Sequence, residues 1–261
     1  MDARTLVRAA TQWIPFSART IAYGTVSLTL GPLTKDHRAS LWAMREWSRS
    51  SARGLDIHVE PIDLQNVPEP PFVYAVNHQS LLDVLVLGGV LPHDFKWAAK
   101  RSLMKIPFLG WHLQLAGHVP VDRQAGSRAA AEVVHKFEEV LHQRKPLLVF
   151  PEGTRSEDGI VRSFKNGGFY ASLRTMTPIV PVALDGTYKL MKKGNIDTGQ
   201  GRIPVKVGKP ILPGKGMKVA ELRDLTHATI LELHRSIGGY VPDIVPPNPL
   251  DSRREGAASA A

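Results

Sequence analysis

The chain has 261 residues, 43% of them hydrophobic and 22% charged, which is enough for one domain with a substantial apolar core. Its 33 Lys and Arg residues outnumber 24 Asp and Glu residues, and the net charge of +9 favours polyanionic partners such as nucleic acid, anionic lipid or phosphorylated substrates. The absence of cysteine excludes disulfides, thiolate metal sites and a thiol nucleophile.

Residues 1–53 have a basic amphipathic pattern. Residues 1–55 hold eight Lys or Arg residues and three acidic ones. On a helical wheel of residues 36–53, one face collects Arg38, Arg45, Arg49 and Arg53, and apolar residues lie opposite. Helices of this kind lie in the headgroup layer of a membrane, anchored by residues such as Trp13, Trp42 and Trp47. The pattern predicts a membrane-association segment, and a helix pair packed on its own domain stays open as the alternative.

No stretch of the sequence has the length and hydrophobicity of a bilayer span. The longest runs without Lys, Arg, Asp or Glu are residues 20–34 and 106–121, and Gly and Pro interrupt both. A span needs about 20 apolar residues. Arg19 also interrupts the apolar stretch that a signal peptide would need. We therefore expect peripheral or monotopic binding at the cytoplasmic face of the cell membrane.

Residues 54–240 are predicted to form one α/β domain, a mixed β-sheet flanked by helices. Apolar runs typical of strands occur at residues 55–59, 72–76, 95–99, 118–121, 147–150, 179–184 and 203–207. Between and after them we expect an irregular proline-rich connector at 61–71, a buried helix at 81–91, a long basic loop at 186–202 and a closing helix at 218–237. Residues 241–261 are predicted to be a disordered tail.

A polar turn follows the predicted strand at 72–76, with the sequence Asn77-His78-Gln79-Ser80-Leu81-Leu82-Asp83. The imidazole of His78 suits general-base chemistry because its ordinary pKa of about 6.5 lies near working pH. Asp83 can orient the ring and stabilise the imidazolium. Two alternatives stay open, since Ser80 and Asp83 also fit a helix capping box and a single turn histidine need not be catalytic.

A second polar turn, Phe150-Pro151-Glu152-Gly153-Thr154-Arg155, follows another predicted strand. Gly153 lets the backbone approach a ligand closely, and the guanidinium of Arg155 offers paired donors to phosphate oxygens. Additional charge can come from two residues that directly follow predicted strands, Lys100 and Arg123. The alternative is that Glu152 and Arg155 form an ion pair within the turn.

These two turns, with the segments at 117–123 and 179–184, resemble the four ordered blocks of the glycerolipid acyltransferase family. That family contains the glycerol-3-phosphate and lysophosphatidic acid acyltransferases, and the likeness covers residues 55–212. In the second block, His118 and Pro120 stand where the family usually has apolar residues, whereas Gly117, Asp122 and Arg123 stand where expected. The resemblance implies a glycerol-3-phosphate acyltransferase-like fold.

The resemblance also implies a reaction, the transfer of an acyl chain from acyl-CoA or acyl carrier protein to lysophosphatidic acid, which forms phosphatidic acid in phospholipid biosynthesis. In that reaction His78 takes the proton of the acceptor hydroxyl, Asp83 orients the imidazole, and the hydroxyl attacks the thioester directly. Substrate binding is implied for Lys100, Arg123, Glu152, Gly153, Thr154 and Arg155. We expect no metal and no other cofactor, because the sequence lacks a His-Glu-x-x-His pattern. It also lacks the Gly-x-Ser-x-Gly nucleophile elbow.

Other functions stay open at this stage. The acceptor can instead be glycerol 3-phosphate, another lysophospholipid or glycolipid, or water in a thioesterase. A non-catalytic basic module that binds membrane or RNA would explain the charge, but it leaves His78, Asp83 and Glu152 without a purpose. The sequence has no aromatic and basic RNA-binding signature, so we expect no nucleic-acid partner.

Overall fold

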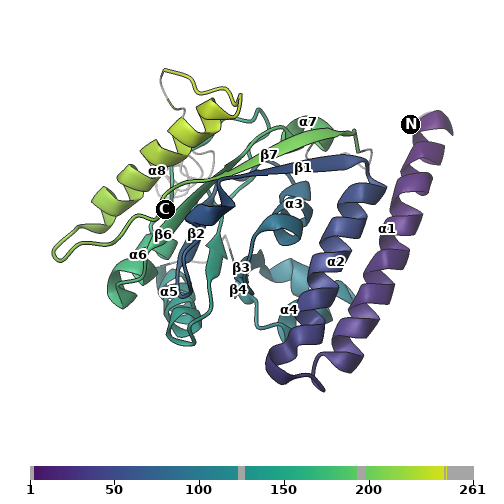
Figure 1. Cartoon of the computed structure of the whole chain (residues 1–261), viewed down its shortest axis with the longest axis horizontal. Coiled ribbons are helices and arrows are strands. Elements are labelled where there is room, and N and C mark those ends of the chain that lie inside the picture. The colour runs from purple at the N-terminus through teal and green to yellow at the C-terminus, as the bar shows by residue number, and fades with distance from the viewer. Residues whose placement is uncertain (1–2, 123–126, 193–197, 244, 246–261) are drawn as a thin grey trace, which may run out of the picture.

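Seven strands form one sheet within residues 3–122, 127–192, 198–243 and 245, which are the residues that the computed structural model describes (Figure 1). The strands are β1 (Ile57–Ile62), β2 (Val73–Val76), β3 (Lys96–Lys100), β4 (Val119–Val121), β5 (Leu147–Val149), β6 (Ile179–Leu184) and β7 (Gly201–Val207). Their order across the sheet is β1-β7-β6-β2-β5-β3-β4. Neighbours are parallel except β6 and β7, which are antiparallel. The predicted mixed α/β sheet is confirmed.

Helices cover both faces of the sheet (Figure 1). They are α1 (Ala3–Leu30), α2 (Arg38–Gly54), α3 (Leu82–Val90), α4 (Leu109–Leu115), α5 (Ser127–His142), α6 (Gly167–Thr175), α7 (Thr187–Leu190) and α8 (Val219–Ser236). Helices α5, α6 and α8 pack on one face. Helix α3 packs on the other, with α2 against it and α1 outside α2.

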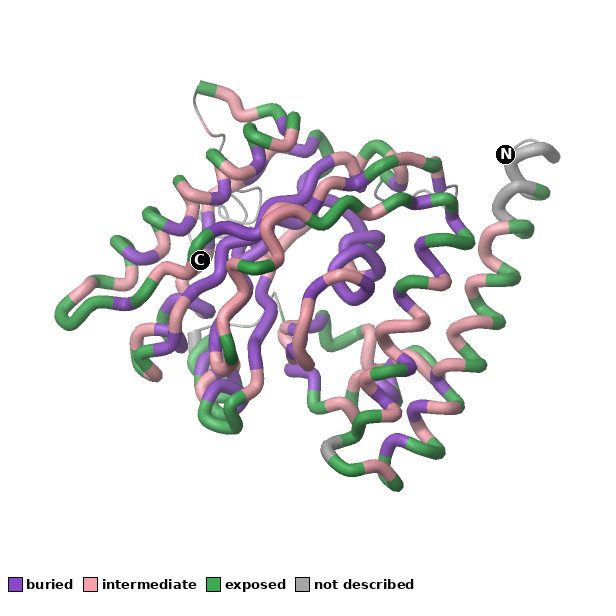
Figure 2. Tube along the Cα trace, viewed as in Figure 1, coloured by how far each residue is buried: buried purple, intermediate pink, exposed green. Residues whose placement is uncertain are grey.

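The central strand β2 is apolar on both faces, and Figure 2 shows the middle of the sheet buried throughout. Phe72, Tyr74 and Val76 join the core under α3, while Val73 and Ala75 join the core under α5, α6 and α8. This alternation follows from the two-residue period of a strand. A strand enclosed on both faces holds its ends firmly, and the turn that follows β2 begins from such an end.

Helices α1 and α2 form a hairpin beside the sheet domain (Figure 1). The indole of Trp47 donates a hydrogen bond to the hydroxyl of Thr20 over 3.0 Å and lies in ring contact with Phe16, which in turn contacts Trp13. Two of the three tryptophans expected to anchor the membrane, Trp13 and Trp47, therefore pack inside the hairpin. Trp42 is exposed.

The basic face of α2 also differs from its predicted role. The guanidinium of Arg45 donates to the carbonyls of Leu91 and His93, and that of Arg49 donates to the carbonyl of Gly89. The carbonyls of Gly89 and Leu91 lie at the carboxyl end of α3, where a helix leaves acceptors unsatisfied and favours positive charge, and that of His93 lies just beyond it. Two of the four arginines expected to meet lipid headgroups thus bind the protein itself.

The outward face of α1 is apolar, with Val7, Ile14 and Ile21 each about half exposed or more. They recur every seven residues and therefore share one side of the helix. Among the described residues, none of the helices is both long and apolar enough to cross a bilayer. The hairpin thus presents an apolar surface outside the core.

Three predicted segments differ in the structure. Pro61 lies inside β1 instead of starting an irregular connector, because β1 is an edge strand and proline's missing donor does no harm there. A short 3-10 helix spans Leu64–Asn66, and α7 begins the segment that was predicted to be a loop. The tail predicted for 241–261 lies mostly outside the described residues.

Candidate active site

The predicted polar segments meet at the carboxyl edge of the sheet because the strands that precede them are parallel and in register. Ala75 of β2 lies opposite Val149 of β5, and Val76 lies opposite Val182 of β6. The turns that follow β2, β5 and β6 therefore leave the sheet side by side. Ligands of open α/β sheets bind at this edge.

His78 and Asp83 form a buried pair. The imidazole Nδ1 lies 2.7 Å from Oδ2 of Asp83, and the two residues are only 5% and 0% exposed. The same oxygen accepts the backbone N–H groups of Gln79 and Ser80, and Oδ1 accepts the hydroxyl of Thr187 at 2.5 Å. Because Nδ1 donates to a carboxylate, Nε2 is left as the basic nitrogen of the ring.

Half of the predicted capping box is present at this turn. The carboxylate of Asp83 accepts the backbone N–H of Ser80, but the hydroxyl of Ser80 donates to the carbonyl of Met191 and not to the start of α3. Asp83 therefore holds both the turn and the imidazole. The ring of His78 also stacks on Phe150 with centroids 3.9 Å apart, so it is held on its edge and on its face.

Glu152 holds the second turn against the first. It is 0% exposed, and its two oxygens accept the backbone N–H groups of His78 at 2.8 Å and Arg162 at 3.0 Å. Burial raises the pKa of Glu152 to about 8, although the two N–H donors oppose that rise. We expected this carboxyl to contact the substrate. Its burial and its bond to the backbone of His78 also make it a clamp on that backbone, and the substrate contact stays a prediction.

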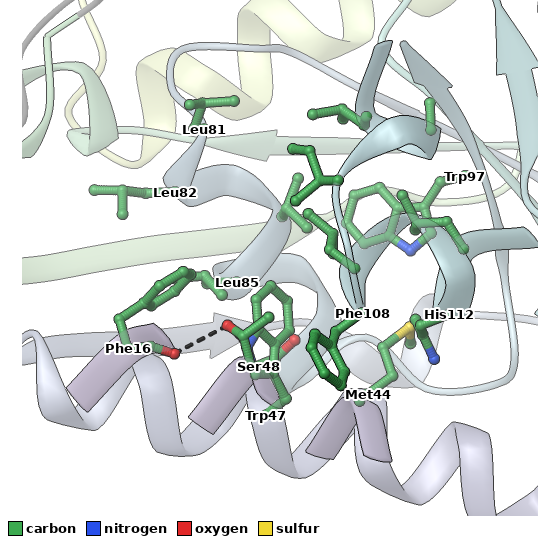
Figure 3. Close-up of a pocket in the computed structure, with 18 of the residues that line it drawn as sticks. Phe16, Met44, Trp47, Ser48, Leu81, Leu82, Leu85, Trp97, Phe108 and His112 are labelled. Atoms are coloured by element: carbon green, nitrogen blue, oxygen red, sulfur yellow. Dashed lines mark hydrogen bonds between the residues drawn. The ribbon is translucent and has the colours of Figure 1, made fainter. Parts of the chain in front are cut away.

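A cavity of about 530 Å³ opens beside His78. Its lining is mostly apolar and comes from the helical hairpin, α3, α4 and β3. Figure 3 shows Phe16, Met44, Trp47, Leu85, Trp97 and Phe108 around it. Two basic residues, Lys100 and Arg155, line the same cavity. The imidazole, two positive charges and an apolar chamber thus share one space.

Of the other predicted binding residues, the structure describes Gly153 and Thr154 but not Arg123. Gly153 has φ of 72°, a conformation that favours glycine, and a side chain there would meet the Lys165 side chain within 3.4 Å. Thr154 is half-buried in the same turn. Arg123 lies outside the described residues. Lys165, an isolated lysine with no local sequence pattern, lies against this turn.

Two further histidines are buried next to the cavity. His112 accepts or donates at Nδ1 with the hydroxyl of Ser27, 2.6 Å away, and His118 accepts the backbone N–H of Trp97 over 2.9 Å. Burial lowers the pKa of His112 to about 4 and that of His118 well below its usual value. Both are therefore neutral packing residues at working pH. Within the part of the chain that the structure describes, no three His, Asp or Glu side chains gather in a way that would hold a metal ion.

Comparisons with known proteins agree with this geometry. The family model for acyltransferases matches residues 58–185. A 1-acyl-sn-glycerol-3-phosphate acyltransferase of Saccharomyces cerevisiae is 30% identical over 85% of this chain and 75% of its own length. A chloroplastic one of Arabidopsis thaliana is 35% identical over 72% of this chain, which spans 53% of that relative.

Among solved structures, the chain is similar to the 1-acyl-sn-glycerophosphate (LPA) acyltransferase PlsC of Thermotoga maritima. The TM-score is 0.78 with 27% sequence identity, and the match covers 91% of this chain and 98% of that one.

Proposed function

The chain belongs to the acyltransferase family that contains the 1-acyl-sn-glycerol-3-phosphate acyltransferases, and we propose that it transfers an acyl chain from a thioester donor to the free hydroxyl of lysophosphatidic acid. The product is phosphatidic acid. The observation that carries this proposal is the buried His78–Asp83 pair beside an apolar cavity that Lys100 and Arg155 also line.

His78 acts as the general base. Its Nε2 takes the proton of the acceptor hydroxyl while the hydroxyl oxygen attacks the thioester carbonyl carbon. The C–S bond then breaks, and the imidazolium returns its proton to the leaving thiolate. Asp83 keeps Nδ1 protonated and stabilises the imidazolium, which supports direct transfer with no acyl-enzyme.

The lining of the cavity supports separate binding regions for the acyl chain and for the phosphate of the acceptor. Its apolar walls suit an acyl chain, since burying each methylene is worth about 0.8 kcal/mol. Lys100 and Arg155 suit the phosphate of the acceptor, because a guanidinium can give two parallel hydrogen bonds to phosphate oxygens. Gly153 and Thr154 offer backbone in the same turn, and Arg123 is proposed from the sequence alone.

We further propose that the hairpin of residues 1–53 docks the enzyme on the cytoplasmic face of the membrane. Val7, Ile14 and Ile21 form an uncharged surface suited to the interface, and Arg38 and Arg53 are two exposed arginines of α2 that can meet anionic headgroups. Because the same hairpin lines the cavity, docking would bring lipid substrates to its mouth.

The test is an acceptor panel with purified protein. Lysophosphatidic acid, glycerol 3-phosphate, other lysophospholipids and no acceptor are each supplied with acyl-CoA or acyl carrier protein, while free thiol is followed and the lipid product is identified. We expect thiol release to require lysophosphatidic acid and to match phosphatidic acid formed. Equal release without an acceptor would indicate a thioesterase, and a higher kcat/KM for another acceptor would reassign the substrate.

A further inference from the structure

A second buried histidine–carboxylate pair lies behind the catalytic turn. His234, on α8, is fully buried, and its Nε2 lies 3.1 Å from Oδ1 of Asp185, the residue directly after β6. Burial would raise the pKa of Asp185, but hydrogen bonds from His234 and Gln79 outweigh it and hold that pKa below its ordinary value. The mechanism described above makes no use of this pair.

Gln79 connects the two pairs. Its backbone N–H donates to Asp83 over 2.7 Å, and its side-chain amide donates to Asp185 over 3.0 Å and to the carbonyl of Gly159. The oxygen of the same amide accepts the N–H of Gly186 over 3.0 Å, which fixes the orientation of the amide.

The carboxylate of Asp185 has no hydrogen to donate, so Nε2 of His234, 3.1 Å away, donates to it. The same nitrogen therefore does not accept from the amide of Gln79, 3.2 Å away, and the two amide hydrogens go to Asp185 and Gly159. Oδ1 of Asp185 thus receives two donors. The ring is also locked by packing, since a Cβ on Gly239 would lie 2.2 Å from it.

We propose that Asp185 and His234 are positioning residues that hold the catalytic turn through Gln79. This proposal rests on the proposed function of His78 and Asp83. With Asp185 held by His234, the amide of Gln79 has one orientation, and the N–H that Gln79 gives to Asp83 keeps the carboxylate in line with the imidazole. Helix α8, remote in sequence, thereby sets the geometry of the general base.

The test replaces His234 in two ways. His234→Leu keeps apolar bulk but removes the donor, and we expect kcat to fall at least about tenfold, since a misplacement of about 1 Å can cost about 100-fold. The KM values for donor and acceptor should change less than about twofold, because no residue of α8 lines the cavity. His234→Gln can place an amide donor near the position of Nε2 and should recover at least half of the lost kcat.

Thr226→Val is the matched control on the same helix. Thr226 is fully buried, and its hydroxyl bonds to Leu222 of the same helix. This variant should lose thermal stability comparably to His234→Leu while keeping kcat within about twofold. If His234→Leu does not fold, Asp185→Asn removes the charge that aligns both donors and should lower kcat in the same manner.

A double-mutant cycle tests the connection through Gln79. In a Gln79→Leu background, His234→Leu should lower kcat by less than about twofold further, because the connecting amide is already lost. The proposal is overturned if His234→Leu keeps wild-type kcat, if His234→Gln is as slow as His234→Leu, or if the effects of the two substitutions multiply. Failure of the proposed function would show differently, as acyl transfer that persists in His78→Ala.

Discussion

The carboxyl edge of the sheet and the α1–α2 hairpin enclose the same cavity by different means. At the sheet edge, buried polar atoms are paired with backbone groups: Asp83 receives two N–H donors and Glu152 another two. The two helices of the hairpin meet through contacts such as the ring contact of Phe16 with Trp47. Proton transfer needs the fixed geometry of the edge, whereas an acyl chain needs only apolar surface that can adapt.

Removal of the base should produce the largest effect at the sheet edge. We expect His78→Ala to lower kcat by about 10²–10⁴-fold, the usual contribution of a positioned base. Vesicle binding should stay unchanged because the hairpin is untouched. Steady-state kinetics and circular dichroism measure both, with His135→Ala as the control, since His135 is an exposed residue of α5. Retention of more than about a tenth of the turnover would contradict the general-base role.

Asp83→Asn separates the shape of the edge from its charge. An asparagine oxygen can still accept the N–H groups of Gln79 and Ser80, and its amide can donate to Thr187 after that hydroxyl rotates. The fold should therefore persist. Loss of the charge should lower kcat by about 10- to 100-fold, as removal of partners that orient a functional histidine does. Wild-type turnover in this variant would show that Asp83 serves only the turn.

Substitutions in the hairpin should change membrane binding and leave turnover nearly unchanged. Reversing two exposed arginines of α2, Arg38→Glu with Arg53→Glu, should weaken binding to anionic vesicles at least about tenfold, at about 1 kcal/mol per basic residue. Turnover of a dispersed short-chain acceptor should change little. Co-sedimentation across salt and anionic-lipid content measures the binding. The control is Lys209→Glu with Lys215→Glu, exposed residues between β7 and α8. Equal loss in both double variants would remove the special role of the hairpin.

Arg155→Lys tests a residue that lines the cavity enclosed by the two regions. The lysine keeps the charge but loses the bidentate fork, so the KM of the phosphorylated acceptor should rise several-fold, up to about tenfold. The KM of the acyl donor should stay within about twofold. If the donor KM rises in place of the acceptor KM, Arg155 binds the phosphates of the donor.

A separate prediction concerns a pH dependence of stability caused by Glu152. Its folded pKa of about 8 lies above its unfolded value, so the folded state holds the extra proton and stability falls as pH rises from about 4.5 to 8. Glu152→Gln removes this titration. Relative to the variant, the wild type should lose up to about 1.4 kcal/mol of unfolding free energy per pH unit. Urea unfolding between pH 5 and 8 measures this, and a constant difference between the two proteins would contradict the raised pKa.

Local patterns were sufficient to predict much of the fold and the centre of the site. The strand pattern located β1 to β7 to within a few residues. Strands buried on both faces, such as β2, β5 and β6, leave continuous apolar runs, whereas the partly exposed β7 leaves an alternating pattern. His78 and Asp83 lie five residues apart, so their pairing follows from one turn. The resemblance of the four blocks to one family then predicted which residues serve the same site.

Contacts between distant residues could not be read in the same way. Gln79 and Asp185 are 106 positions apart, and their contact depends on β2 lying beside β6. A helical wheel gives arginines the same face whether they meet lipid or, as Arg45 and Arg49 do, helix-end carbonyls. The pattern around Glu152 likewise does not distinguish a substrate contact from a backbone clamp.

The most direct test of direct acyl transfer follows thiol release in the first turnover. Wild-type enzyme is mixed rapidly with labelled acyl-CoA, with and without lysophosphatidic acid, and both free thiol and protein-bound label are measured. We predict that thiol appears only with the acceptor, in step with phosphatidic acid, and that no label becomes attached to protein, because His78 activates the acceptor and no acyl-enzyme forms. One equivalent of thiol released without acceptor, with one equivalent of acylated protein, would contradict the mechanism.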